Sequence, residues 1–239
     1  MRGGAAGNFS RVVRLVLFDI DGTLIRTGGA GVRAFERTFA ESFDLASATK
    51  KLKFSGRTDV SLVRECFLQH QIEPSEANFR RFFDNYPAFL EQLLSESNGE
   101  ICKGIGAMIE QLERAPEQPL LGLLTGNIRR GAELKLRHYN LWHHFKTGAF
   151  SDDHENRNCI AGIAMQRGEE LLGRKLAGEE IVVVGDTPHD ITCGQSIGAK
   201  VLAVGSGEFS SAQLAALKPA WAVNHVGEIA IAEVLGRTA

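Results

Sequence analysis

Hydrophobic residues gather in short continuous runs that recur along this chain. Such runs are typical of strands in the middle of a parallel sheet, where both faces of a strand are covered. They predict strands at residues 12–20, 119–124, 147–150, 181–184, 200–205 and 221–223.

Between these runs the apolar residues are spaced three and four apart, which is typical of amphipathic helices. Helices are predicted at residues 106–114, 128–138, 159–172, 189–197 and 211–217, with a last one near the C-terminus. Strands that alternate with helices favour a parallel sheet with helices on both faces. The sequence therefore predicts an α/β fold with a Rossmann-like core.

Residues 28–99 interrupt this alternation, because they contain several helical patterns and no convincing strand. Thr58 is a plausible N-cap for one of these helices, and residues 75–95 predict another. We therefore predict three parts: a flexible tail at 1–11, a catalytic core made of 12–27 and 100–239, and an all-helical insert at 28–99.

Polar residues directly follow three of the predicted core strands. They are Asp19 and Asp21 after the first, Thr125, Gly126 and Asn127 after the second, and Asp186 and Asp190 after a later one. Ligands of open α/β sheets bind outside the carboxyl ends of the strands, so these side chains are expected to converge. Four aspartates at one edge would repel each other without a divalent cation, and Mg²⁺ prefers such oxygen ligands.

Each of these features also has a purely structural interpretation. Asp21-Gly22 is a frequent hairpin turn, although a helical pattern rather than a partner strand follows it. Asp190 could be an acidic residue favoured in the first turn of a helix, and Thr125 could begin an ordinary turn. The glycines at 28–31 lack the Lys-Ser/Thr of a phosphate-binding loop and are interpreted as a hinge.

Charge and cysteine usage narrow the function classes. With 27 basic and 29 acidic residues the formal net charge is −2, so nucleic acid and membrane surfaces are not expected partners. No apolar run approaches the ~20 residues needed to cross a bilayer. Four well-separated cysteines without paired spacing favour reduced thiols in a cytoplasmic protein.

Three motifs in order resemble the haloacid dehalogenase (HAD) superfamily. D-I-D-G-T-L is similar to the first motif of that superfamily. Thr125, which ends the next core strand, is similar to the second motif, and G-D-T-P-H-D is similar to the fourth. The insert after the first motif resembles the helical cap of the phosphoglycolate phosphatase and β-phosphoglucomutase branch. The resemblance covers the chain from about residue 12 to the C-terminus.

The resemblance implies a role for each motif residue. Asp19 would be the nucleophile that forms an aspartyl phosphate, and Asp21 the acid and base that serves the leaving oxygen and the water. Mg²⁺ would be held by the side chains of Asp19 and Asp186 and the carbonyl of Asp21, with Asp190 in support. Thr125 and the backbone of Gly126 and Asn127 would bind the phosphoryl group.

The third motif departs from the family pattern, which generally has a lysine after the third core strand. The matching position in F-S-D-D-H-E-N-R-N is Arg157, which is always charged and can donate two hydrogen bonds to phosphate. The alternative is that Arg157 lies on the surface and that Lys146 or Lys175 supplies the charge.

One further site residue is expected in the insert. Arg57, in F-S-G-R-T-D, resembles the Gly-Arg-x-Asp segment by which related caps meet their ligands, and it would select substrates with a second anionic or oxygen-rich group. The alternative is a local ion pair between Arg57 and Asp59.

The predicted function is a Mg²⁺-dependent phosphatase of small-molecule phosphomonoesters, acting as a monomer or homodimer. A phosphomutase of the β-phosphoglucomutase type would share the same core chemistry. A non-catalytic binding protein is a third alternative, although such proteins commonly lose a motif aspartate and none is lost here.

Overall fold

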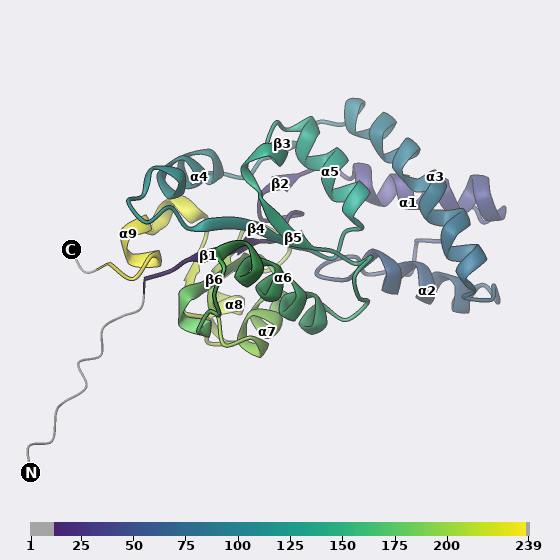
Figure 1. Ribbon diagram of the computed structural model, residues 1–239. Helices are drawn as coiled ribbons and strands as arrows, with labels where there is room; N and C mark the ends of the chain where they lie inside the picture. Colours follow the sequence, from purple (N-terminus) through teal and green to yellow (C-terminus); the bar gives the residue numbers. More distant parts are fainter. Residues whose placement is uncertain (1–11, 238–239) are drawn as a thin grey trace, which may run out of the picture.

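The computed structural model describes residues 12–237, so the predicted tail at residues 1–11 lies outside the described residues. Six parallel strands form one sheet in the order β5-β4-β1-β6-β7-β8. Figure 1 shows this sheet with helices on either side of it. They are β1 (Leu15–Phe18), β4 (Leu120–Leu124), β5 (Thr147–Ala149), β6 (Ile181–Gly185), β7 (Lys200–Val204) and β8 (Trp221–Val223). The predicted α/β fold is confirmed.

The central strand β1 explains the continuous apolar run at the start of the chain. It lies between β4 and β6, and all four of its side chains are buried. Val16 and Phe18 belong to one hydrophobic cluster, whereas Leu15 and Leu17 belong to a second. Successive side chains of a strand point to opposite faces, and both faces of β1 pack in a hydrophobic cluster. The strand therefore has no solvent face and no polar position.

Helices cover both faces of this sheet. The cluster of Val16 and Phe18 is completed by α4 (Ile105–Arg114), α5 (Arg129–His138) and α9 (Ile231–Val234). The cluster of Leu15 and Leu17 is completed by α6 (Arg157–Leu172), α7 (Pro188–Ser196) and α8 (Ser211–Ala215). Short 3₁₀ turns lie at Trp142–His144, Gly178–Glu180 and Val226–Glu228.

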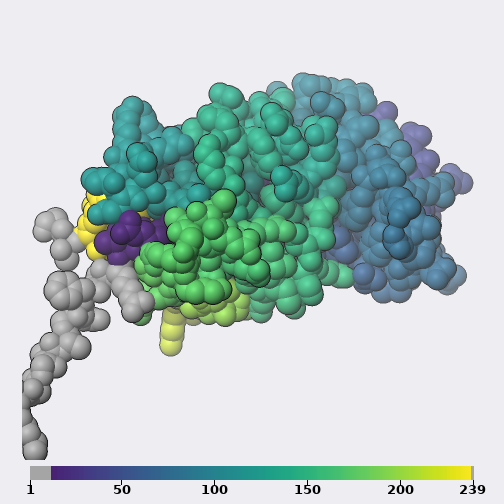
Figure 2. Space-filling model, viewed as in Figure 1, coloured from purple at the N-terminus to yellow at the C-terminus, as the bar shows by residue number. Residues whose placement is uncertain are grey.

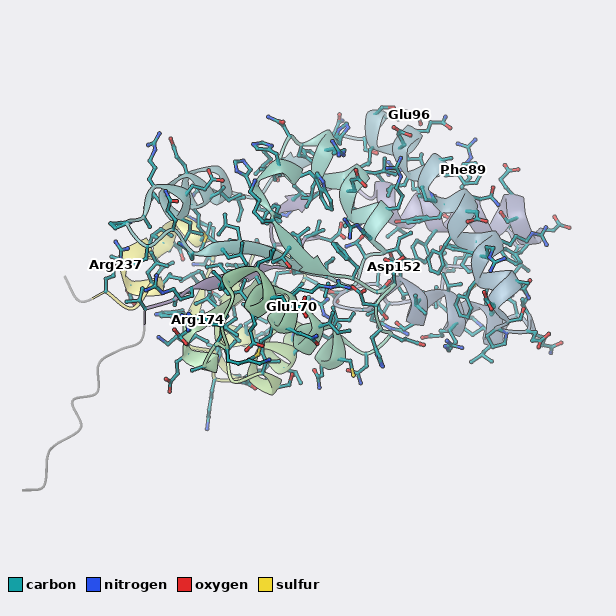
Figure 3. All side chains as sticks on the ribbon, viewed as in Figure 1. Phe89, Glu96, Asp152, Glu170, Arg174 and Arg237 are labelled. Atoms are coloured by element: carbon teal, nitrogen blue, oxygen red, sulfur yellow. The ribbon has the colours of Figure 1, made fainter. Side chains whose placement is uncertain are left out.

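Three further helices, α1 (Ala30–Phe43), α2 (Asp59–Gln69) and α3 (Glu76–Ser95), form a lobe at one end of the molecule (Figure 2). Phe89 and Glu96, near the end of α3, lie at this end, and Arg237 lies at the opposite one (Figure 3). A third hydrophobic cluster, rich in phenylalanine, holds the lobe together. It includes Ile128 and Leu134, which belong to α5 and its N-cap, so the lobe also packs on the core.

Capping residues begin two of these helices. The Thr58 hydroxyl accepts a hydrogen bond from the Ser61 amide at 3.3 Å, so it is the predicted N-cap of α2. Ser75 caps α3 in the same way, because its hydroxyl accepts a hydrogen bond from the Asn78 amide at 3.4 Å. Val32, in the first turn of α1, is 40% exposed.

The sequence did not predict a second, very small sheet. β2 (Ile25–Arg26) pairs antiparallel with β3 (Glu100–Ile101), and these strands are the two passages of the chain between the large sheet and the helices α1–α3. Two residues per strand are too few to show an alternating pattern. Within the described residues, no helix is both long and apolar enough to cross a membrane.

Candidate active site

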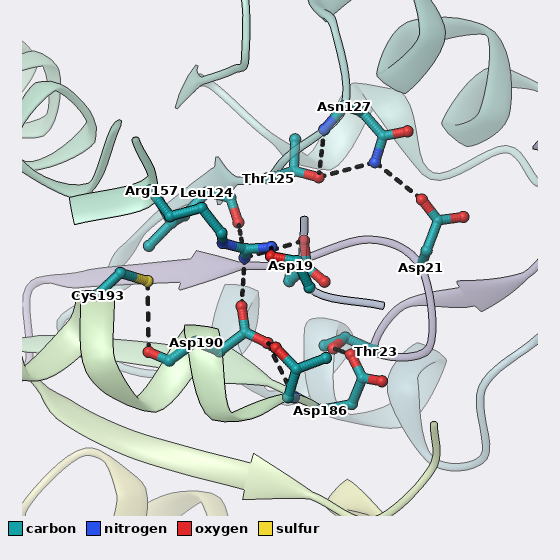
Figure 4. Close-up of polar contacts among 12 residues, drawn as sticks. Asp19, Asp21, Thr23, Leu124, Thr125, Asn127, Arg157, Asp186, Asp190 and Cys193 are labelled. Carbon is teal, nitrogen blue, oxygen red and sulfur yellow. Dashed lines mark hydrogen bonds and ion pairs between the residues drawn. The ribbon is translucent and has the colours of Figure 1, made fainter. Parts of the chain in front are cut away.

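Three aspartates meet at the carboxyl end of the sheet. Asp19 follows β1, Asp186 follows the neighbouring strand β6, and Asp190 lies in the first turn of α7. All three are buried, and one carboxylate oxygen from each lies within 4.8 Å of the others (Figure 4). The structure therefore brings together residues that are up to 171 positions apart, as the strand-end argument predicts.

Burial and mutual repulsion disfavour the charged forms of this aspartate cluster. Burial raises the pKa of Asp19 to about 7; Arg157 opposes this effect, and the charges of Asp190 and Asp21 add to it. Burial also raises the pKa of Asp186 to about 8, again with contributions from neighbouring carboxylates. Carboxylates in this situation favour either protons or a cation among them.

The oxygens of Asp19 and Asp186 are better placed than those of Asp190 to bind a hard divalent cation. Both oxygens of Asp190 already accept hydrogen bonds, because Arg157 donates to its Oδ1 while the amide and hydroxyl of Thr187 donate to its Oδ2 at 3.0 and 2.7 Å. Asp186 accepts from the Thr23 hydroxyl at 3.0 Å through Oδ1. Asp19 and Asp186 thus retain oxygens for a metal such as Mg²⁺.

Arg157 is the cation that lies beside the cluster. It is buried at the first position of α6, which begins two residues earlier than predicted because Asn156 caps it. Its guanidinium binds Asp190 and lies 3.4 Å from Asp19 Oδ1. Its Nε is buried without a hydrogen-bond partner among the described residues.

Neither alternative lysine reaches this place. Lys146 Nζ donates to the carbonyl of His143 at 2.8 Å, and the exposed Lys175 pairs with Glu169 at 2.6 Å. Of the three cations considered from the sequence, the structure brings only Arg157 to the aspartates.

The segment after β4 lies against both the core and the insert. The Thr125 hydroxyl accepts hydrogen bonds from the amide and the side chain of Asn127, at 3.3 and 2.9 Å. At Gly126 a Cβ atom would lie 2.1 Å from the carbonyl oxygen of Arg57. Glycine is therefore required there, because the backbone of the insert occupies the space of a side chain.

Asp21 does not join the three-aspartate cluster. Its side chain is 44% exposed, and its Oδ2 accepts from Asn127 Nδ2 at 2.8 Å and from Lys135 Nζ at 2.6 Å. Lys135 was missed from the sequence because α5 carries many basic residues. The available signal was its spacing: Lys135 follows the buried Ile128 and Ala132 on the apolar face of that helix.

Some of these residues, but not Asp186 or Asp190, line a pocket of about 160 Å³ between the core and the insert. Its core wall includes Asp19, Asp21, Thr125, Lys135 and Arg157, and its insert wall includes Phe35, Phe54, Asp59, Leu62 and Tyr86. The volume is below the roughly 300–1,000 Å³ of pockets for drug-sized ligands, so the site suits a small substrate.

The start of α2 fastens the insert over this pocket. The Asp59 amide donates to the Gly126 carbonyl at 2.7 Å, and the Asp59 carboxylate accepts from the Ile128 amide at 2.8 Å. Burial raises the pKa of Asp59 to about 7, against the opposing charge of Lys135. Arg157 adds a contact by donating to the Gly56 carbonyl at 3.2 Å.

Arg57 lines the pocket, but its guanidinium is not directed to the aspartates. It pairs with Glu65 and lies 3.4 Å from the Ser61 hydroxyl, both on α2. The alternative pair with Asp59 is not formed, and that carboxylate instead binds the amide of Ile128.

A family model described as haloacid dehalogenase-like hydrolase matches residues 16–204. The chain belongs to this family. It is therefore a hydrolase, and the resemblance seen in its motifs is confirmed.

This HAD hydrolase is similar in sequence to one curated relative and in fold to two solved structures. The pyrophosphatase PpaX of Bacillus cereus is 26% identical over 222 residues, which cover 91% of this chain and 94% of that protein. A HAD hydrolase of family IA, variant 3, from Entamoeba histolytica has a TM-score of 0.71 at 21% identity, covering 93% of this chain and 98% of that one. A predicted phosphoglycolate phosphatase from Haemophilus somnus has a TM-score of 0.69 at 18% identity, covering 93% and 97%.

Proposed function

We propose that this HAD hydrolase is a Mg²⁺-dependent phosphatase that cleaves small phosphomonoesters through an aspartyl phosphate on Asp19. The observation that carries the proposal is the position of Asp19. It is buried at the wall of a small pocket, 3.4 Å from Arg157 and within 4.8 Å of two further aspartates. The name of the Bacillus cereus relative, a pyrophosphatase, supports hydrolysis of a phosphoryl bond.

In the first step an Asp19 oxygen attacks phosphorus, and the bond from phosphorus to the leaving oxygen breaks. Asp21 gives a proton to that oxygen, so the product leaves as an alcohol. Arg157, the Thr125 hydroxyl and the backbone amides after it would bind the phosphoryl oxygens. The unpartnered Nε of Arg157 is a further donor in the same region.

In the second step water attacks the phosphorus of the aspartyl phosphate, and Asp21 takes the proton from that water. The bond between phosphorus and Asp19 breaks, which releases inorganic phosphate and restores the carboxylate. The insert wall of the pocket limits bulk water during both steps, because Asp59 and Gly56 bind it to the core.

Mg²⁺ would be held by the carboxylates of Asp19 and Asp186 and the carbonyl of Asp21, with Asp190 orienting Arg157. Bound there, Mg²⁺ would neutralise negative charge on the phosphoryl oxygens. Burial, with the charges of neighbouring carboxylates, raises the pKa values of Asp19 and Asp186, and a bound cation would offset both effects.

The test is a panel of phosphomonoesters and inorganic pyrophosphate with Mg²⁺, measured by phosphate release. Asp19→Asn should abolish turnover and phosphoenzyme formation while the fold persists, because a carboxamide is a poor nucleophile. Appreciable turnover by that variant would contradict the mechanism. Isomerisation of a sugar phosphate without net phosphate release would favour the phosphomutase alternative.

A further inference from the structure

A buried lysine lies next to the proposed acid and base. Lys135 is 4% exposed, and its Nζ donates to Asp21 Oδ2 and to Asn127 Oδ1, both at 2.6 Å. The Asn127 amide group donates to the same Asp21 oxygen at 2.8 Å. The three side chains therefore form a closed ring of hydrogen bonds, in which Lys135 also orients the amide of Asn127.

Stability alone does not account for a lysine at this position. Removing an ammonium from water is costly even when it is paired, and an apolar residue of similar length would fill the same space. A Cβ atom on Gly31 would lie 3.5 Å from Lys135 Nζ, so the ammonium lies beside the first turn of α1. That end of a helix carries positive partial charge and disfavours cations.

We infer that Lys135 is a positioning residue that holds Asp21 for proton transfer to the leaving oxygen. The inference rests on the proposed function. Asp21 is half exposed and lies beyond the end of β1, so without its partners the carboxylate could rotate toward solvent. Both side-chain donors bind Oδ2; among the described residues none binds Oδ1, which remains for the proton.

The step itself needs no chemistry from Lys135. As the bond from Asp19 to phosphorus forms and the bond to the leaving oxygen breaks, one proton passes from Asp21 to that oxygen. Lys135 keeps all of its protons and acts only on the direction of the carboxylate. Its effect should therefore depend on how much the leaving oxygen needs a proton.

The experiment uses this dependence. The leaving group of an alkyl phosphate is a strongly basic alkoxide unless its oxygen is protonated. The leaving group of p-nitrophenyl phosphate is a stable phenolate that needs no proton. The ratio kcat/KM reports the steps up to departure of the leaving group, so it separates this step from later hydrolysis. The quantity to be measured is kcat/KM for both substrates, in the wild type and in the variants Lys135→Met and Lys135→Arg. Lys146→Met serves as the control.

Lys135→Met should lower kcat/KM for the alkyl phosphate by about 10²-fold, the scale of a lost general acid. For p-nitrophenyl phosphate the loss should stay below about fivefold. Lys135→Arg keeps a cation and should recover part of the alkyl activity, and Lys146→Met should match the wild type. The Met variant should fold, because the exposed half of Asp21 stays hydrated; if it does not, Lys135→Gln takes its place.

Equal losses on both substrates, or no loss on either, would overturn the inference. The proposed function is tested separately with Asp19→Asn. If that variant is inactive while Lys135→Met changes kcat/KM equally for both substrates, only the role of Lys135 is rejected. If Asp19→Asn remains active, the proposed function fails first.

Discussion

Asp59→Asn isolates one buried charge in the contact between the insert and the core. The Asp59 carboxylate accepts from the Ile128 amide, and the asparagine oxygen can accept the same hydrogen bond. The substitution therefore removes the titration of the group and keeps its main contact. Because Asp59 lies outside the aspartate cluster, its effect can be measured with excess Mg²⁺ present.

The direction and size of the effect follow from the pKa. Burial raises the pKa of Asp59 from 3.8 to about 7. Between these values the folded protein holds a proton that the unfolded chain has lost, so this group lowers the stability as the pH rises. The shift of about three pKa units corresponds to on the order of 4 kcal/mol above pH 7. The contribution of Asp59 is most favourable below pH 4 and is lost as the pH passes 7.

Urea denaturation from pH 4.5 to pH 8 measures this difference. Asp59→Asn should be close to the wild type at the acidic end and more stable by up to about 4 kcal/mol at pH 8. The control is Asp84→Asn, which removes an exposed carboxylate on α3 and should not change the pH dependence. Parallel curves for Asp59→Asn and the wild type, or a less stable variant at pH 8, would refute the reasoning.

Two further predictions concern the aspartate cluster and its cation. Asp186→Ala should weaken Mg²⁺ binding, measured calorimetrically, more than Asp190→Ala does, because both oxygens of Asp190 are already occupied by protein donors; the opposite order would contradict the proposed ligand set. Arg157→Ala should lower kcat by about 10²-fold or more, since a charged donor to the phosphoryl group is lost, whereas Lys146→Ala should leave kcat unchanged; equal effects would place the third motif elsewhere.

The sequence predicted the sheet and the strand-end residues well because both depend on local patterns. Buried strands such as β6 are continuous apolar runs, and the residue after each run can be read directly. The sequence also favoured Arg157, although it did not show that α6 starts there, because the cap at Asn156 depends on a single side chain.

What could not be predicted depends on distant contacts. Lys135 differs from its basic neighbours on α5 only in facing the core, and its partner Asp21 is 114 positions away. The pair formed by Arg57 and Glu65 was also missed, since the local alternative considered was Asp59. That carboxylate is instead occupied by the Ile128 amide, on the far side of the contact between insert and core.

The small sheet of β2 and β3 has a consequence for how such a chain can change. Ile25 is paired with Ile101, so the insert leaves the core and returns to it at neighbouring points. A segment whose ends already meet can vary in length at little entropic cost to the rest of the molecule, because loop closure depends only weakly on length. Variation among homologues could therefore remodel the wall around the leaving group while the sheet edge with its aspartates keeps its geometry.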